Sequence, residues 1–299
     1  MTDIIIIGAG PAGLCAAIYA SRAGKSVKIL EKSTFGGQMT FSPKIENYPA
    51  EMVISGAELA DKMVEHALSL GVEIELEEVL KIENSGDTKT VITDTATHTC
   101  RAVIIATGAH HRKLGVEGED KFEGAGVSFC AVCDGAFYAG QDVVVVGGGN
   151  SALQETLLLS EICKSVTVVQ NLDFFTGEAK LVEQVMKKEN VKTVLGAVVE
   201  KVLGEDKFSG VQIAFADGRK EKITADGMFV AIGLKPENEA FSDVAALDKI
   251  GYIVSDESCT TSSEGVFVAG DCRTKSIRQI ATAVADGAVA ALAAVRYIG

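Results

Sequence analysis

The chain opens with the stretch Ile4-Ile-Ile-Ile-Gly8-Ala-Gly10-Pro11-Ala-Gly13, and Val143-Val-Val-Val-Gly147-Gly-Gly149-Asn-Ser-Ala152 repeats its pattern near the middle. In each stretch a β-branched run predicts a buried parallel strand, and a glycine-rich turn leads into a helix. One such motif alone is weak, but here a second strand ends at the same spacing from each first glycine, at Glu31 and at Gln170. The repeat predicts an α/β fold with two Rossmann-like, three-layer nucleotide-binding domains.

Both glycine-rich turns have the residues that a dinucleotide pyrophosphate requires. The first glycine permits a tight turn, the second lets the pyrophosphate approach the backbone, and the third small residue lets the helix lie close to the strand. The helix N-terminus then directs free N–H groups and its positive dipole end at the phosphates, and Pro11 suits a first helical turn. The residues concerned are Gly8, Gly10, Pro11, Ala12 and Gly13 in the first motif, and Gly147, Gly149, Asn150, Ser151 and Ala152 in the second.

The order of the remaining segments predicts that one domain is inserted in the other. Strands at 102–106 and 228–231 close the two halves, and Lys235-Pro236 has the composition of a linker. The chain then returns to end in a helix of small residues. We expect an outer nucleotide-binding domain of residues 1–112 and 243–299, and an inner one of residues 113–242.

Composition excludes several classes of protein. The net charge of -13 argues against nucleic acid as a partner, because phosphate binding needs a basic surface. No uninterrupted apolar run reaches the roughly 18 residues of a membrane span, and no export signal is visible at the N-terminus. The seven cysteines form an odd, scattered set, so we expect a reducing cytoplasm and one working pair rather than a disulfide framework.

The working pair is in Cys130-Ala-Val-Cys133-Asp134. Half of a zinc site is the competing interpretation, but there is no second CxxC, and the four histidines have no ligand spacing to this one, so we expect no metal. At the start of a helix, the dipole and the partner thiol would stabilise one thiolate. The motif therefore predicts disulfide chemistry beside two nucleotide cofactors.

With these motifs, the chain resembles the bacterial low-molecular-weight thioredoxin reductases over essentially its whole length. The resemblance includes both glycine-rich turns, the CxxCD, Ala106-Thr107-Gly108, and Gly265–Asp271 followed by Arg278-Gln279. It implies FAD in the outer domain, a pyridine nucleotide in the inner one, and a cytoplasmic homodimer that reduces thioredoxin or a similar small redoxin.

The same resemblance implies the FAD contacts in the outer domain. Glu31 would hold the adenosine ribose and Asp271 the ribityl chain, and Arg278 would stand near the flavin edge, where reduction places negative charge. The alternatives are a solvated strand-end acid for Glu31, a helix cap for Asp271 and an outward ion-pair donor for Arg278. The other contacts expected besides the first glycine-rich turn are Gly37, Gln38, Asn47, Ala106, Thr107, Gly108, Gly270, Gln279 and Ile280.

For the dithiol, the resemblance implies a division of roles. Cys133 would face the flavin and accept its electrons, whereas Cys130 would attack the disulfide of the partner protein. Cys133 would then resolve the mixed disulfide. Asp134 would transfer the thiol proton; it could also cap the helix, and the two roles are compatible.

The segment that should bind the electron donor departs from the family. NADPH-dependent members carry a His-Arg-Arg run and a further Arg for the 2′-phosphate, whereas Gln170, Asn171, Leu172 and Thr176 stand here. Without a cation, each charge-assisted hydrogen bond that is lost costs roughly 1.5–3 kcal/mol. We expect NADH to be favoured over NADPH, with Gln170 on the ribose. The alternatives are a ferredoxin-dependent flavin thioredoxin reductase and a non-enzymatic, redox-sensing flavoprotein module.

Overall fold

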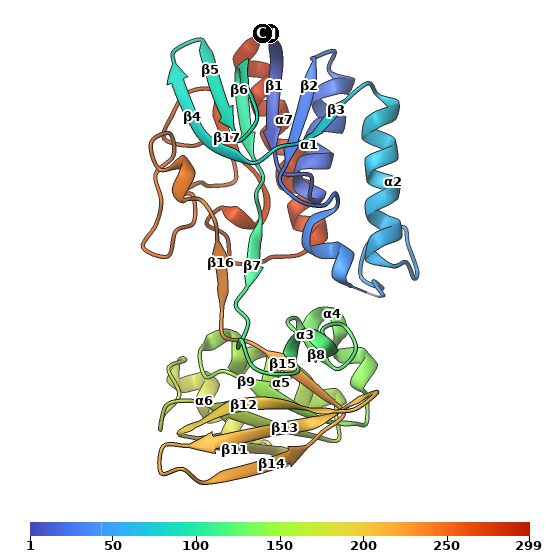
Figure 1. Cartoon of the computed structure of the whole chain (residues 1–299), viewed down its shortest axis with the longest axis vertical. Coiled ribbons are helices and arrows are strands. Elements are labelled where there is room, and N and C mark those ends of the chain that lie inside the picture. The colour runs from blue at the N-terminus through green and yellow to red at the C-terminus, as the bar shows by residue number, and fades with distance from the viewer. Residues whose placement is uncertain (43) are drawn as a thin grey trace. The chain divides into compact units, whose positions relative to one another are not determined.

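The computed structural model describes residues 1–42 and 44–299, which fold into two compact units. Unit 1 consists of Met1–His110 and Lys235–Gly299, and unit 2 is His111–Leu234 (Figure 1). The sequence placed these boundaries at residues 112 and 242. In the structure, residues 235–242 belong to unit 1, where the buried Asn238 donates from its amide to the carbonyls of Gly251 and Cys272, both at 2.9 Å.

A seven-stranded sheet forms the centre of unit 1, in the order β3-β2-β1-β6-β5-β4, with β17 paired to β6. β1, β2, β3, β6 and β17 run parallel, while β4 and β5 form an antiparallel hairpin that continues onto β6. The strands are β1 (Thr2–Ile7), β2 (Val27–Glu31), β3 (Glu73–Leu76), β4 (Val79–Ser85), β5 (Thr88–Thr93), β6 (Thr97–Ile105) and β17 (Val266–Val268).

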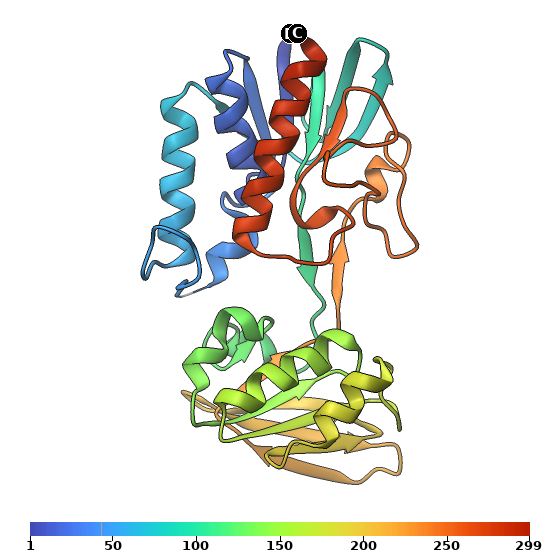
Figure 2. The ribbon, with the colours of Figure 1, turned by 180° about the vertical axis from the view of Figure 1, so that it is seen from behind.

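Three helices of unit 1 lie on one face of this sheet: α1 (Pro11–Arg22), α2 (Gly56–Ser69) and α7 (Ile280–Ile298) (Figure 2). Small residues let α1 and α7 approach closely, since a Cβ added at Gly287 would lie 2.2 Å from the carbonyl oxygen of Ala12. The side chains of Ile4 and Ile6 face these helices, whereas Ile5 and Ile7 join the core on the opposite side. The apolar run at the N-terminus is therefore buried from both faces, as the sequence predicted.

By length and composition alone, α7 could cross a membrane. Core helices pass the same test, and α7 has such a place in unit 1, because Ala283, Ala290 and Ala294 are buried in the apolar core. It also carries the buried Asp286, whose carboxylate pairs with two cations. The packing of α7 thus accounts for its apolar composition within unit 1.

Unit 2 repeats the strand order of unit 1. Its parallel sheet has the order β11-β10-β9-β15-β8, so that β9, β10, β11 and β15 correspond to β1, β2, β3 and β6. A second, antiparallel sheet has the order β12-β13-β14. The strands are β8 (Val127–Ser128), β9 (Asp142–Val146), β10 (Ser165–Gln170), β11 (Val191–Leu195), β12 (Ala197–Gly204), β13 (Phe208–Phe215), β14 (Lys220–Thr224) and β15 (Gly227–Val230).

The helices of unit 2 and the short connecting elements complete the chain. β7 and β16 pair where the chain passes between the units. The α/β class with two Rossmann-like units is confirmed. The elements are α3 (Glu119–Phe122), α4 (Ala131–Asp134), α5 (Asn150–Ile162), α6 (Ala179–Met186), β7 (Ala109–His111), β16 (Leu234–Pro236), and the 3-10 turns η1 (Gly37–Phe41), η2 (Gly135–Tyr138), η3 (Glu239–Phe241) and η4 (Gly270–Cys272).

Candidate functional site

The first glycine of each motif occupies a position that no other residue would fit. Gly8 has φ +106° and Gly147 has φ +135°, in the region that L-residues rarely adopt. A Cβ at Gly8 would lie 2.4 Å from the carbonyl oxygen of Ala106, and one at Gly147 would lie 2.4 Å from that of Ala231. Each turn is therefore pressed against the end of the neighbouring strand, β6 or β15.

The second glycine of each motif leaves room for a ligand. A Cβ at Gly10 would meet nothing within 4 Å, and one at Gly149 would meet only the hydroxyl of Thr176, at 3.7 Å. Gly10 is the N-cap of α1 and Gly149 that of α5, and neither helix has a side-chain cap bond. By contrast, a Cβ at Gly13 would lie 1.9 Å from the carbonyl oxygen of Gly8. Both helix starts therefore have the open space and uncapped N–H groups that an anion site requires.

Glu31, at the end of β2, is only 8% exposed. Its carboxylate accepts hydrogen bonds from the backbone N–H of Ala9 at 2.8 Å and of Ser33 at 2.9 Å. These contacts exclude the solvated strand-end acid. The hydroxyl of Ser33 also donates to it, at 3.3 Å. A carboxylate has about four acceptor positions, so about one is left for a hydroxyl group of a ribose.

Asp271 lies in η4, and its Oδ1 atom is buried without a hydrogen-bond partner in residues 1–42 and 44–299. Burial raises the pKa of this carboxyl to about 6. η4 has no side-chain cap bond, so Asp271 is not a helix cap. A buried oxygen that lacks a donor fits a ligand hydroxyl group, such as those of the ribityl chain of FAD.

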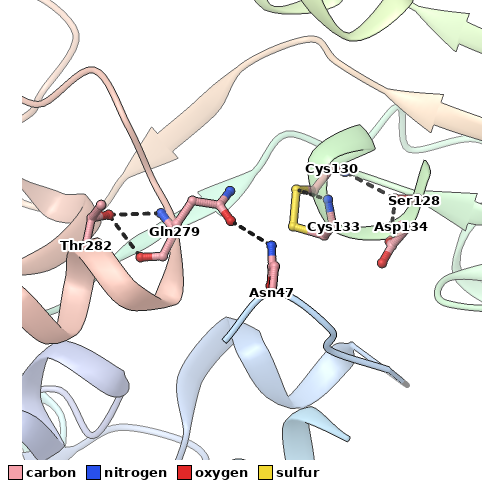
Figure 3. The surroundings of a disulfide bond; sticks show 7 residues. All are labelled: Asn47, Ser128, Cys130, Cys133, Asp134, Gln279 and Thr282. Carbon is pink, nitrogen blue, oxygen red and sulfur yellow. Dashed lines mark hydrogen bonds between the residues drawn. A yellow bond between two sulfur atoms is a disulfide. The ribbon is translucent and has the colours of Figure 1, made fainter. Parts of the chain in front are cut away.

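The start of α7 brings two of the expected contacts together. Gln279 is the N-cap of α7 and forms a capping box with Thr282, and its side-chain oxygen accepts from the amide of Asn47 at 3.2 Å (Figure 3). Ile280 is the first residue of the helix. Arg278 stacks its guanidinium 4.3 Å from the ring centre of Tyr252, so it is not simply an outward ion-pair donor.

The remaining expected FAD contacts lie at the ends of β6 and α1. A Cβ at Gly37 would be 3.2 Å from the Cα atom of Gly10, so the two turns touch. The amide of Gln38 bonds to the ring of His110 at 2.9 Å. Thr107 donates from its hydroxyl to the side-chain oxygen of Asn238 at 3.1 Å, with Ala106 and Gly108 on either side along the chain.

The sequence did not single out Asp286, which supports this turn from α7. Its carboxylate accepts from the N–H of Gly270 at 3.0 Å, twice from Arg273 at 2.9 and 2.8 Å, and from Lys275 at 2.8 Å. Burial acts to raise the pKa of Asp286, but the two cations outweigh it and hold the pKa below its usual value. The available signal was an acid inside a helix of alanines, together with the two cations of Arg273-Thr274-Lys275 that precede this helix.

In unit 2, Cys130 and Cys133 form a disulfide (Figure 3). Cys130 is the N-cap of α4, and its sulfur accepts from the N–H of Cys133 at 3.2 Å, as expected for a dithiol at a helix start. The other five cysteines are buried free thiols. Burial raises the pKa of Cys15 to about 11, for example, which keeps that thiol protonated. The described residues thus contain one disulfide pair.

Asp134 is the last residue of α4, and its Oδ2 accepts from the hydroxyl of Ser128 at 2.6 Å (Figure 3). Its Oδ1 is buried and has no partner among the described residues. Burial raises the pKa of Asp134, and the Ser128 bond opposes that effect. Since Cys130 caps α4, Asp134 does not, and its carboxyl is placed to hold a proton. Ser128, which also accepts from the N–H of Cys130 at 3.1 Å, was missed in the sequence.

The nucleotide motif of unit 2 has the expected turn, and the segment that follows β10 brings no positive charge to it before Lys180. Gln170 is 5% exposed, and its amide is engaged by its own loop: Oε1 accepts from the N–H of Asn171 at 3.2 Å, and Nε2 donates to the carbonyl of Phe174 at 3.3 Å. The segment from Gln170 to Gly177 contains no Lys or Arg. At the start of α5, the side-chain oxygen of Asn150 accepts a hydrogen bond from the N–H of Glu178 at 2.7 Å.

One group of side chains in the described part of the chain could hold a metal ion: Glu75, Glu77 and His98 in unit 1. Its groups already have protein partners. Lys28 pairs with Glu75 at 2.6 Å, while Thr93 and His98 bond to Glu77 at 2.6 and 2.8 Å. These bonds account for the cluster as an ion-pair network of the sheet.

Comparison with known proteins gives a match over nearly the whole chain. Residues 2–287 match the family model described as pyridine nucleotide-disulphide oxidoreductase. A "34.2 kDa protein in rubredoxin operon" of Clostridium pasteurianum is 44% identical, covering 99% of this chain and 97% of the relative. The thioredoxin reductase of Listeria monocytogenes is 41% identical, covering 99% and 93%.

Solved structures agree with this result. The crystal structure of thioredoxin reductase from Streptococcus pyogenes has a TM-score of 0.96 and 43% identity, covering 100% of this chain and 98% of that one. Thioredoxin reductase from Giardia duodenalis has a TM-score of 0.93 and 35% identity, covering 99% and 98%.

Proposed function

Since the chain belongs to the pyridine nucleotide-disulphide oxidoreductase family, and within it to the low-molecular-weight thioredoxin reductases, we propose that it reduces the disulfide of thioredoxin or a similar small redoxin. The chain is an FAD-dependent oxidoreductase that acts on a disulfide, rather than a sensing module. The observation that carries the proposal is the Cys130–Cys133 disulfide, at the start of α4, beside the buried carboxyl of Asp134.

Unit 1 has residues that fit FAD. The turn at Gly8 and the start of α1 would bind the pyrophosphate, Glu31 the adenosine ribose, and the unpartnered oxygen of Asp271 a hydroxyl group. The start of α7, at Gln279, would add its positive dipole end and the N–H groups that the capping box leaves free. When bound, FAD supplies the electron pair that reduces the disulfide of unit 2.

In unit 2, we assign the steps of disulfide exchange to three residues. Uptake of an electron pair breaks the bond between Cys130 and Cys133. The Cys130 thiolate then attacks one sulfur of the partner disulfide and expels the other, which forms a mixed disulfide. Cys133 attacks the Cys130 sulfur, re-forms the internal disulfide and releases the reduced partner. Burial raises the pKa of Asp134, so this carboxyl can hold a proton and give it to the sulfur of the partner that leaves.

For the electron donor, we propose NADH in preference to NADPH. The start of α5 can receive a pyrophosphate, which supports a pyridine nucleotide. The neutral Gln170 and the absence of Lys and Arg between Gln170 and Gly177 argue against the 2′-phosphate of NADPH. The acidic Asp173 and Glu178 add negative charge to the same region.

A ferredoxin is the second candidate donor, and the engagement of Gln170 favours it. Both polar atoms of this buried side chain already bond to their own loop, so a ribose gains little from it. Anaerobic bleaching of the flavin by NADH, NADPH and reduced ferredoxin, measured in parallel, separates the candidates. We expect NADH to match or exceed NADPH, and Asn171→Arg with Leu172→Arg to shift the preference towards NADPH. A strong preference for NADPH in the unmodified protein would contradict the proposal, and bleaching by ferredoxin alone would select the alternative.

We further propose a homodimer in the cytoplasm. The five buried free thiols suit a reducing compartment, and the homodimer follows from the family resemblance. Light scattering after gel filtration tests the dimer.

The function itself is tested by thioredoxin reduction with an electron donor that bleaches the flavin. We expect turnover in the unmodified protein and in Cys163→Ser, a change at a buried thiol outside the pair. Cys130→Ser should lose turnover and keep its FAD. Full turnover in Cys130→Ser would refute the proposal.

A further inference from the structure

The carboxyl of Glu155 lies against the dithiol helix, and the chemistry above does not use it. Glu155 is on α5, which packs against α4. Glu155 lies between Ala152 and Leu159, which pack against Ala131, and the backbone N–H of Ala131, the residue that follows Cys130, acts to lower the pKa of this carboxyl. The Oε2 atom is buried and has no hydrogen-bond partner within residues 1–42 and 44–299. A buried carboxylate oxygen without a donor is costly, and a proton on the carboxyl removes that cost.

Close packing holds α5, and with it Glu155, against the dithiol helix. Ala131 is 2% exposed and lies in one apolar cluster with Ala152 and Leu159 of α5. A Cβ added at Gly135, the residue after Asp134, would lie 3.1 Å from the Leu159 side chain. α4 therefore cannot move away from α5 without opening this core. The Glu155 carboxyl stays next to the main chain that joins the two cysteines.

Burial is the main influence on the pKa of Glu155. It raises the pKa of this carboxyl to about 7, against the opposing effect of the Ala131 N–H. Asp134, at the other end of α4, also has its pKa raised by burial. The titratable groups on the elements that pack against α5 are Cys130, Cys133 and Asp134 at α4, Tyr138 on η2, Asp142 on β9, and Lys180 and Glu183 on α6.

We propose that Glu155 is a positioning residue that sets the charge of the reduced dithiol, so that its carboxyl and the two sulfurs share one negative charge. The inference rests on the proposed role of Cys130 and Cys133. When the S–S bond breaks, the pair takes up two electrons; with one proton, it becomes one thiol and one thiolate. An ionised Glu155 beside that thiolate would be a second buried anion, so one further proton is taken up by the carboxylate or by the sulfur. While the carboxyl holds this proton, the attacking thiolate is stabilised.

The test measures the thiolate directly in the reduced, FAD-containing protein. Alkylation by iodoacetamide is followed by mass spectrometry from about pH 5 to pH 10, since only the thiolate reacts. The five other cysteines are buried, so the peptide with Cys130 and Cys133 reports the dithiol. Glu155→Gln keeps an oxygen for the Ala131 N–H but can carry no charge. Glu161→Gln, on the same helix and exposed, is the matched control.

We expect Glu155→Gln to lower the pH midpoint of alkylation by about one unit, which is about tenfold in thiolate fraction. Glu161→Gln should match the unmodified protein. A midpoint unchanged in Glu155→Gln would overturn the inference. Should that variant not fold, Cys133→Ser, which leaves one thiol in the motif, decides: a two-step pH profile for alkylation of Cys130 supports the shared charge, and a single step overturns it. If the midpoint does not shift in Glu155→Gln while Cys130→Ser loses turnover, only the role of Glu155 is refuted. If Cys130→Ser retains turnover, the proposed function is refuted.

Discussion

Replacing Asp286 by Ala removes the shared acceptor of a buried ion cluster. Asp286 is 9% exposed, and its partners Arg273 and Lys275 are 4% and 7% exposed, so water screens these charges little. Removing one partner of a buried pair costs about 3–5 kcal/mol, because the remaining charge stays buried without compensation. Here two cations and the N–H of Gly270 lose their acceptor. We expect the free energy of unfolding of unit 1 to fall by at least about 3 kcal/mol.

Urea unfolding followed by FAD fluorescence measures this loss, since we place the flavin in unit 1. Asp286→Asn, which keeps an oxygen for Gly270, should lose less, and the exposed control Asp61→Ala should stay within about 0.5 kcal/mol. Because the folded pKa of Asp286 is lowered, its contribution is present above about pH 4 and disappears as the pH falls through that lowered value. A loss below about 1 kcal/mol in Asp286→Ala at pH 7 would refute the reasoning.

Three further predictions concern the two cofactor sites and the dithiol. Cys133→Ser should bind FAD but lose thioredoxin reduction, as Cys130→Ser does, and full turnover would contradict the assigned roles. Gly10→Val should empty the flavin site, seen as loss of yellow colour, because its side chain would fill the space open to the pyrophosphate, whereas Gly149→Val should spare FAD and impair only pyridine-nucleotide use; the opposite pattern would reverse the assignment of the units. Asp134→Asn should slow turnover and remove the fall in rate as the pH rises through the raised pKa of Asp134, and an unchanged pH profile would exclude its role as an acid.

Much of the fold could be predicted because its signals are local. The strands β1 and β9 are continuous β-branched runs, and each is followed by glycines that its turn requires. The helix α2 was not predicted, although Ser55 caps it at the N–H of Glu58 and apolar residues follow at helical spacing. The order of segments along the chain indicated that one domain is inserted in the other. The return of the chain to unit 1 after Leu234 depends on the burial of Asn238, which spacing does not reveal.

The site residues that were missed belong to contacts between distant segments. Asp286 acts on Gly270 from within α7, and Glu155 reaches Ala131 from α5. Ser128 precedes the CxxC by only two residues, but a serine there has no distinctive pattern until the fold turns it towards Asp134. Sequence motifs contain the groups that we propose react, and the three-dimensional packing reveals the side chains that contact them.

The insertion of unit 2 into unit 1 also imposes an order on protein synthesis. The ribosome completes His111–Leu234 before it makes β17, η4 and α7. Unit 2 is continuous along the chain and can fold as a unit while unit 1 still lacks Asp271 and its last helix. A nascent chain should therefore possess its dithiol before it can retain a flavin, and FAD capture becomes the step that marks a finished molecule.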